Sequence, residues 1–168
     1  SGNVSTCTMS ITIEDDEDPT VTCPASVTQT ADADSCNAAV TIGLPTSADN
    51  CAIMSVLNDY NSGSDASDIY PVGTTTVVYT ATDSSSNTAT CSLDVTIEDD
   101  EDPTITCPSD MTQSTDAGSC DAAVTVSGEM ADDNCAVMSV MNDFNNTTDH
   151  SDTYPLGTTT VTLTAMDA

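Results

Sequence analysis

The chain has 168 residues, with 28 Asp and Glu, one His and no Lys or Arg, so its formal net charge is −28. The absence of basic residues excludes nucleic-acid binding through a basic patch, because such binding uses Lys or Arg to displace counterions. No apolar run approaches the ~20 residues of a membrane span, so we expect no membrane insertion. An apolar content of 38%, abundant Thr and eight Cys predict an ordered, β-rich chain rather than a disordered one.

The sequence repeats with an offset of 84 residues: the segment from Ile13 to Thr20 returns unchanged from Ile97 to Thr104. A repeat at a fixed period indicates tandem modules, and the Pro that follows each acidic run marks a module start. We therefore predict three parts: the last strand and acidic linker of a preceding module at 1–18, a complete repeat with its linker at 19–102, and a repeat lacking its last strand at 103–168.

Apolar and polar residues alternate along several segments, which predicts half-buried strands. In chain order we expect strands at 7–13, 21–23, 27–30, 38–42, 53–58, 77–81, 91–97 and 161–165. No segment has a helical period. About seven short strands per 84 residues predict an all-β fold of tandem immunoglobulin-like β-sandwich modules.

Two interpretations fit the position of the first predicted strand. In one, the chain is a window from a long tandem array. In the other, residues 4–13 complete the open module of a neighbouring chain by donor-strand assembly. Both interpretations pair residues 4–13 with a segment such as 158–166, and the second makes the chain its own head-to-tail partner.

A sandwich this small has a thin core, so we expect disulfides to staple each module, and therefore an oxidising, extracellular or cell-surface location. Zinc is a weak alternative, because the sequence has no C-x-x-C pair and a single His. The four Cys of a module allow three pairings. We favour Cys23–Cys36, Cys51–Cys91 and Cys107–Cys120, with Cys135 bonded to Cys7 of a neighbouring chain or repeat.

Five consecutive carboxylates form each linker, from Glu14 to Asp18 and again from Glu98 to Asp102. Like charges repel and no basic residue neutralises them, so we expect a cation, and carboxylate oxygens favour Ca²⁺. Loops after two of the strands should reach the same end of the module. The expected ligands are Glu14, Asp15, Asp16, Asp18, Asp49 and Asp83 at the first linker, and Glu98, Asp99, Asp100, Asp102, Asp133 and Asp167 at the second. The alternative is a solvated acidic face that keeps the chain soluble.

Several motifs together resemble the hyalin repeat (HYR) family. They are Asp18-Pro19-Thr20 with Cys23-Pro24, Asp49-Asn50-Cys51, the segment from Pro71 to Val77, and Ala81-Thr82-Asp83 before Asn87-Thr88-Ala89-Thr90-Cys91. The resemblance covers both 84-residue periods. One departure is Ser86, where the family pattern has Gly. The resemblance implies an immunoglobulin-like extracellular module for adhesion or structure, and no catalysis.

The expected function is structural: a calcium-stiffened, disulfide-linked extracellular array or homopolymeric filament. The alternative is an adhesin that binds carbohydrate or protein through the long polar loops at 58–70 and 142–154. We do not expect an enzyme. His150 has Asp149 and Ser151 beside it, but sequence neighbours do not make a catalytic triad, and the equivalent position in the first copy is Ala66.

Overall fold

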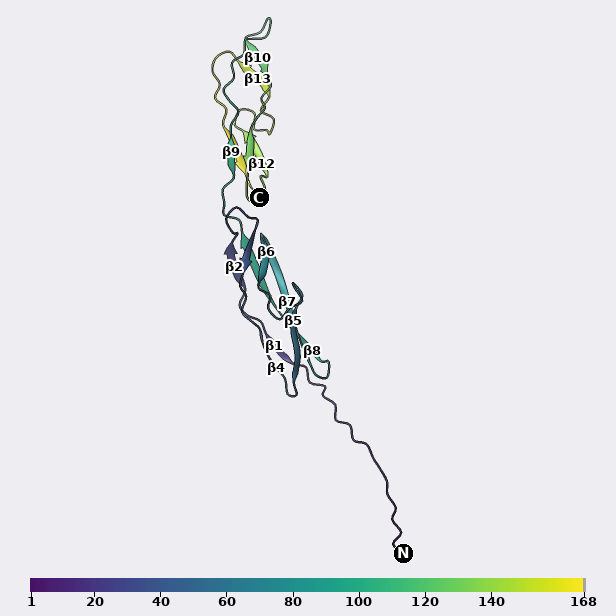
Figure 1. Ribbon diagram of the computed structural model, residues 1–168. Coiled ribbons are helices and arrows are strands. Elements are labelled where there is room, and N and C mark those ends of the chain that lie inside the picture. The colour runs from purple at the N-terminus through teal and green to yellow at the C-terminus, as the bar shows by residue number, and fades with distance from the viewer. Residues whose placement is uncertain (168) are drawn as a thin grey trace. The chain divides into compact units, whose positions relative to one another are not determined.

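The computed structural model describes residues 1–167, and these residues form strands and loops without any helix (Figure 1). The chain divides into two compact units. The first comprises Ser1–Thr28 with Ala39–Thr96, and the second comprises Gln29–Ala38 with the chain from Ile97 onward. None of the described residues belongs to a helix long and apolar enough to cross a membrane. The fold is all-β, as predicted, and consists of tandem immunoglobulin-like modules stapled by disulfides.

The first repeat (residues 19–102) contains eight strands. They are β1 (Thr20–Thr22), β2 (Val27–Thr30), β3 (Asn37–Val40), β4 (Thr46–Ala48), β5 (Ile53–Asn58), β6 (Asp68–Pro71), β7 (Gly73–Asp83) and β8 (Thr88–Glu98). One sheet has the order β2-β8-β7-β5, while β1 pairs with β4 and β3 pairs with β6. Strand β8 therefore lies between β2 and β7 and is paired on both sides.

The core of the first repeat follows from the alternation along β7 and β8. Every second side chain of these strands is buried: Val77, Tyr79 and Ala81 on β7, and Leu93, Val95 and Ile97 on β8. Burying a side chain of this size contributes about 1.5–3 kcal/mol. Tyr70 on β6 is also buried and stacks on Tyr60, with ring centroids 4.2 Å apart. The predicted alternation is confirmed at these strands.

The second repeat (from residue 103) forms fewer and shorter strands from the equivalent sequence. They are β9 (Thr104–Thr106), β10 (Asp121–Val124), β11 (Met130–Asp132), β12 (Ser139–Asn142), β13 (Asp152–Pro155) and β14 (Leu163–Met166). They pair as β9–β11, β10–β13 and β12–β14. Among its described residues only Ala122, Asn142 and His150 are buried. The second repeat therefore keeps the equivalents of β1–β4, β3–β6 and β5–β7, and lacks the equivalents of β2 and β8 among its described residues.

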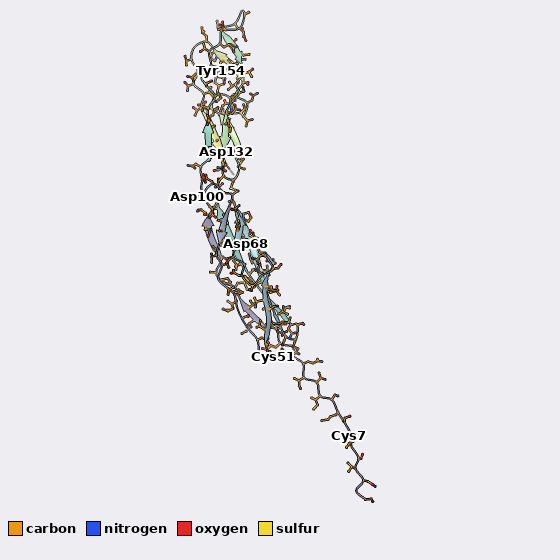
Figure 2. The ribbon with its side chains drawn as sticks, in the orientation of Figure 1. Cys7, Cys51, Asp68, Asp100, Asp132 and Tyr154 are labelled. Atoms are coloured by element: carbon orange, nitrogen blue, oxygen red, sulfur yellow. A yellow bond between two sulfur atoms is a disulfide. The ribbon has the colours of Figure 1, made fainter. Side chains whose placement is uncertain are left out.

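Residues 7–13 do not form the predicted strand. Residues 1–13 are all exposed and carry no regular secondary structure. Figure 2 shows Cys7 on this extended segment, and its thiol is free. Ile11 is 73% exposed although its equivalent, Val95, is fully buried. The prediction is wrong for the isolated chain because no strand edge among its described residues pairs with this segment.

The predicted disulfide pairings are also wrong. Cys23 is bonded to Cys91, and Cys36 is bonded to Cys135. Cys23 precedes β2 and Cys91 lies on β8, so neighbouring strands of one sheet bring them together. Cys36 lies in the 31–36 loop, which belongs to the second compact unit together with Cys135.

These bonds take up one or both cysteines of three expected pairs: Cys23–Cys36, Cys51–Cys91 and Cys135–Cys7. The fourth expected pair, Cys107–Cys120, does not form either, because both of its cysteines are free. Four cysteines of the described chain remain as exposed free thiols: Cys7, Cys51, Cys107 and Cys120. Cys36–Cys135 joins a loop of the first repeat to the second repeat, which a pairing scheme confined to single modules does not consider.

Candidate metal centre

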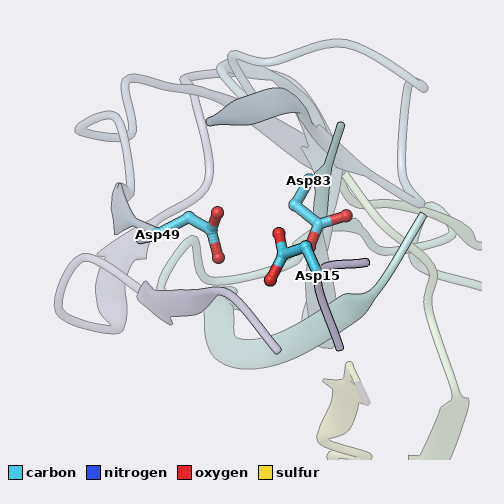
Figure 3. Close-up of side chains that lie close together, drawn as sticks. All are labelled: Asp15, Asp49 and Asp83. Atoms are coloured by element: carbon cyan, nitrogen blue, oxygen red, sulfur yellow. The ribbon is translucent and has the colours of Figure 1, made fainter. Parts of the chain in front are cut away.

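Three aspartates from distant parts of the first repeat meet at one end of the module (Figure 3). Asp15 lies on the acidic linker, Asp49 follows β4 and Asp83 ends β7. Each offers a carboxylate oxygen within 4.8 Å of the other two. The linker, the loop after β4 and the β7–β8 turn therefore converge as the sequence predicted.

The linker is held against the β7–β8 turn by amide side chains. Asn87 Nδ2 donates to the backbone carbonyl oxygens of Asp15 and Glu17, at 3.2 Å each. Asn50 Nδ2 donates to Asp15 Oδ1 at 3.4 Å and to Glu17 Oε2 at 3.1 Å. Sequence reasoning missed the role of Asn87, although its position four residues after Asp83 in a predicted turn is typical of a side chain that caps a loop.

Asp49 uses one carboxylate oxygen and leaves the other without a partner. Its Oδ2 accepts hydrogen bonds from the backbone N–H groups of Cys51 at 2.8 Å and Ala52 at 3.0 Å, which fixes the turn as an Asx motif. Its Oδ1 is buried and makes no hydrogen bond. A buried carboxylate oxygen without a partner is costly, so this atom is a candidate metal ligand.

Asp83 is fully buried. Its Oδ1 accepts from the backbone N–H groups of Ser85 and Asn87, at 2.8 Å each, and its Oδ2 accepts from Asn87 Nδ2 at 2.8 Å. Burial alone would raise the pKa of this carboxyl, but the hydrogen bonds from Asn87, Ser85 and Ser86 outweigh it and hold the pKa below its ordinary value. Asp83 is therefore kept ionised at neutral pH.

Ser86 occupies the left-handed region of the backbone in this turn, with φ of 76°. Glycine adopts this conformation more readily than serine, so the Ser at the family's Gly position carries a conformational cost of order 1 kcal/mol. The turn nevertheless forms, and it presents Asp83 to the cluster.

The second repeat builds the same cluster from equivalent residues. Asp99, Asp133 and Asp167 offer carboxylate oxygens within 4.8 Å of one another. Asp133 Oδ2 accepts from the backbone N–H groups of Cys135 and Ala136, at 2.9 Å each. The Oδ1 atoms of Asp133 and Asn134 are buried without a hydrogen-bond partner. Recurrence of the arrangement, including the partnerless Oδ1, shows that it is a property of the repeat.

The remaining predicted ligands lie outside both clusters and are exposed: Glu14, Asp16, Asp18, Glu98, Asp100 and Asp102. Figure 2 shows Asp100 on the second linker. Successive side chains of an extended segment point in opposite directions, so one aspartate of each linker, Asp15 or Asp99, reaches its cluster. Oxygen-only ligand sets of this kind suit a hard cation such as Ca²⁺.

The long loop after β5, which we considered as an adhesive surface, uses its polar groups internally. Asn58 Oδ1 accepts from the backbone N–H groups of Tyr60 and Asn61, and Asn58 Nδ2 donates to Asn61 Oδ1 and to Gly63 O. Asn142 makes the corresponding bonds in the second repeat. These hydrogen bonds shape the loops and leave fewer free groups for a ligand.

His150 is buried in the loop of the second repeat. Its Nδ1 lies 3.3 Å from Asn142 Nδ2, and its Nε2 lies 3.8 Å from Glu129 Oε1. The neighbouring Asp149 accepts a hydrogen bond from the backbone N–H of Ser151. The three residues therefore contribute to loop structure, and these contacts among the described residues do not form a nucleophile–base–acid chain.

Comparison with known proteins agrees with this architecture. The family model of the HYR domain matches residues 14–97 and, a second time, residues 98–168. The chain is 32% identical over 166 residues to the protein named hyalin of Strongylocentrotus purpuratus, which covers 96% of this chain and 13% of that protein. HYR domains are extracellular, adhesion-related structural repeats rather than enzymes. This chain, in which the HYR domain recurs with an offset of 84 residues, belongs to the HYR domain family.

Proposed function

We propose that the chain is a structural repeat of an extracellular array, and that Ca²⁺ fixes each acidic linker on the module that follows it. The observation that carries this proposal is the three-aspartate cluster, present in both repeats with the same buried, partnerless carboxylate oxygen. Membership of the HYR family, whose domains are extracellular and adhesion-related, supports the extracellular location. A cation shared by Asp15, Asp49 and Asp83 would restrict the linker relative to the module that follows it.

The charge balance supports a cation at these clusters. Three carboxylates lie within 4.8 Å, and the chain holds no Lys or Arg to neutralise them. Like charges at such distances repel, and the repulsion is stronger where the groups are removed from water. The hydrogen bonds around Asp83 hold it ionised, so protonation of that residue does not relieve the repulsion at neutral pH.

The cation we propose is Ca²⁺. It takes 6–8 oxygen ligands in flexible geometry, whereas Mg²⁺ requires a near-octahedral set and keeps several waters. Three aspartates contributed by a linker, a loop and a turn make an irregular set, which a larger and less demanding ion accommodates. Water and nearby carbonyl oxygens would complete the coordination.

A thermal melt with and without calcium tests the proposal. A ligand that binds only the folded state at 100 times its Kd stabilises that state by about 2.7 kcal/mol, which corresponds to a midpoint shift of about 10 °C or more in a module of this size. We expect calcium to raise the midpoint of the purified chain, and a chelator to reverse the rise.

Two adjacent linker residues provide matched variants. Asp15→Asn removes a cluster ligand, and Asp16→Asn removes the same charge from an exposed neighbour outside the cluster. We expect Asp15→Asn to reduce the calcium response of the first repeat, and Asp16→Asn to retain it. If the acids form only a solvated face, calcium produces no shift and both variants stabilise the chain by relieving repulsion, which would overturn the proposal.

A further inference from the structure

The second repeat has an open apolar groove. Its volume is about 590 Å³, and its lining includes Cys107, Met111, Val124, Tyr154, Val161 and Leu163. All the apolar residues of this set are half-buried or exposed. The equivalents of four of them in the first repeat, Val40, Tyr70, Val77 and Tyr79, are fully or almost fully buried. The groove therefore corresponds to a position that is covered in the first repeat.

Strand β8 occupies that position in the first repeat, where it lies between β2 and β7. The equivalents of its two neighbours lose their strand structure in the second repeat. Residues 111–114, which correspond to β2, form no strand, and neither do residues 157–162, which correspond to the first half of β7. Both edges of the groove thus have backbone groups available for pairing with an added strand.

Residues 4–14 are the sequence equivalent of β8. Met9, Ile11 and Ile13 take the places of the buried Leu93, Val95 and Ile97, yet all three are exposed. Residues 1–13 also carry no acidic side chain, although the chain contains 28 acids. An uncharged, alternating and unpaired segment suits insertion into an apolar groove without burying a charge.

The free cysteines fall into two pairs when the observed disulfides are moved by one repeat of 84 residues. The bond Cys23–Cys91, shifted by one repeat, becomes Cys107 with a residue equivalent to Cys7. The bond Cys36–Cys135 likewise becomes Cys120 with a residue equivalent to Cys51. These two shifted bonds use Cys7, Cys51, Cys107 and Cys120, which are the four free thiols of the described chain.

We propose that residues 4–14 of a second copy of this chain fill the groove of the second repeat as an added strand, in the position of β8, with Cys7 bonded to Cys107 and Cys51 bonded to Cys120. This inference rests on the proposed structural function and names its partner. In the first repeat Thr76 Oγ1 donates to Asp94 Oδ1, and the hydroxyls of Thr74 and Thr96 lie 3.1 Å apart. The same register places Ser10 opposite Thr160, and Thr12 opposite Thr158.

Each bond forms from two thiols, which lose two protons and two electrons as the S–S bond is made. A small-molecule disulfide such as oxidised glutathione accepts them and leaves as two thiols. The described residues offer one donor segment and one groove on different parts of the chain, so the contact is heterologous and adds copies head to tail. Unless the rotation closes a ring, the product is a filament.

The first test compares two single-residue variants of the donor segment in the full chain. Ile11→Asp places a charge in the groove, whereas Thr8→Asp adds the same charge where the equivalent Ser92 is exposed. Both residues lie on the exposed segment, so neither change disturbs the fold of the chain itself. An unpaired buried charge costs enough to weaken association on the order of a hundredfold. We expect sedimentation to show assembly for the native chain and for Thr8→Asp, and its loss for Ile11→Asp; equal behaviour of the two variants overturns the proposal.

The second test maps the bonds. The chain is oxidised with glutathione disulfide in chelator, then digested without reduction by an Asp- or Glu-directed protease, since trypsin has no site to cut. Mass spectrometry should find Cys7–Cys107 and Cys51–Cys120 between copies. Mixing the variant Cys7→Ser/Cys51→Ser with the variant Cys107→Ser/Cys120→Ser should give a covalent dimer that neither forms alone.

Bonds of the type Cys7–Cys7 or Cys107–Cys120, or a chain that stays monomeric, would refute the proposal. The chelator keeps the two proposals distinguishable. Linked copies without any calcium response would support strand exchange and reject the metal centre, whereas a calcium response in an unlinked monomer would do the reverse.

Discussion

Val95 and Ile11 are the same position of the repeat in two environments, and truncating each to Ala gives different expected results. Val95 is fully buried in the sheet of the first repeat, whereas Ile11 is 73% exposed. Val95→Ala removes two methyl groups from a packed site and should cost about 2 kcal/mol, by comparison with measured core truncations. Ile11→Ala removes more carbon atoms but should change the stability of the unassembled chain by no more than about 0.5 kcal/mol.

Thermal unfolding of unassembled chains measures this difference. Free thiols are blocked by alkylation at low protein concentration, which leaves Cys23–Cys91 and Cys36–Cys135 intact. A loss of about 2 kcal/mol lowers the midpoint of a module of this size by about 10 °C. We therefore expect a shift of that size for Val95→Ala, and almost none for Ile11→Ala.

In oxidised, assembled chains the midpoint shifts caused by Val95→Ala and Ile11→Ala should become similar, because Ile11 is then buried as Val95 is. The second repeat should become easier to unfold in the Ile11→Ala assembly than in the native one. A large loss for Ile11→Ala in the alkylated monomer would show that the segment already packs on its own chain, and the reasoning from its exposure would be refuted.

Three further predictions concern the first repeat. Tyr70→Phe removes the hydroxyl that donates to Ala66 O at 2.6 Å, with both residues fully buried, and should cost about 1–2 kcal/mol in urea unfolding; Tyr60→Phe, whose hydroxyl is exposed, should cost less, and equal losses would contradict this. Hydrogen bonds hold the pKa of Asp65 and Asp83 below the ordinary 3.8 in the folded state. In chelator, these two carboxylates therefore add to the free energy of unfolding above pH 3.8, and this stabilisation is lost as the pH falls through their lower folded-state pKa values. Burial raises the pKa of Tyr70 to about 12, so its stabilisation of the folded state is complete below pH 10 and is lost between about pH 10 and 12. Melting temperatures that do not fall in the acid range and in this alkaline range would contradict these pKa shifts.

The strands were predictable where alternation and pairing partners coincide. Val27–Thr30 and Ile53–Asn58 have the bounds that the sequence predicted, and β7 and β8 enclose the predicted segments. The segment at 7–13 has the same alternation as β8, yet it forms no strand. Alternation predicts which face of a strand would be buried, but a strand also needs an edge to pair with, and that depends on what lies beside it.

The disulfides could not be derived from spacing within one module. A bond between Cys23 and Cys36 closes a short loop and is favoured by proximity in sequence. The observed bonds join cysteines 68 and 99 residues apart, because sheet order, rather than sequence distance, brings Cys23 to Cys91. The bond from Cys36 to Cys135 lies outside any scheme that treats the repeat as the unit of pairing.

The residues of the aspartate clusters were predicted in part, for a geometric reason. Composition identifies the linker as acidic but cannot distinguish Asp15, which joins the cluster, from Glu14 or Asp16, which do not. That choice depends on Asn87 and Asn50, whose side chains fix the linker backbone and aim one carboxylate at Asp49 and Asp83. A pattern of carboxylates thus overstates the number of ligands when the segment is extended.

Some structural connections of this chain join residues of successive repeats and do not stay within one 84-residue period. Each aspartate cluster combines a linker residue with two residues of the module that follows, and Cys36–Cys135 begins in one repeat and ends in the next. A single 84-residue copy therefore contains cysteines that only a neighbouring copy can satisfy. If the proposed strand exchange is correct, the stability of the second repeat depends on the neighbouring copy. The second repeat at the end of a filament, whose groove is open, should therefore unfold before the others.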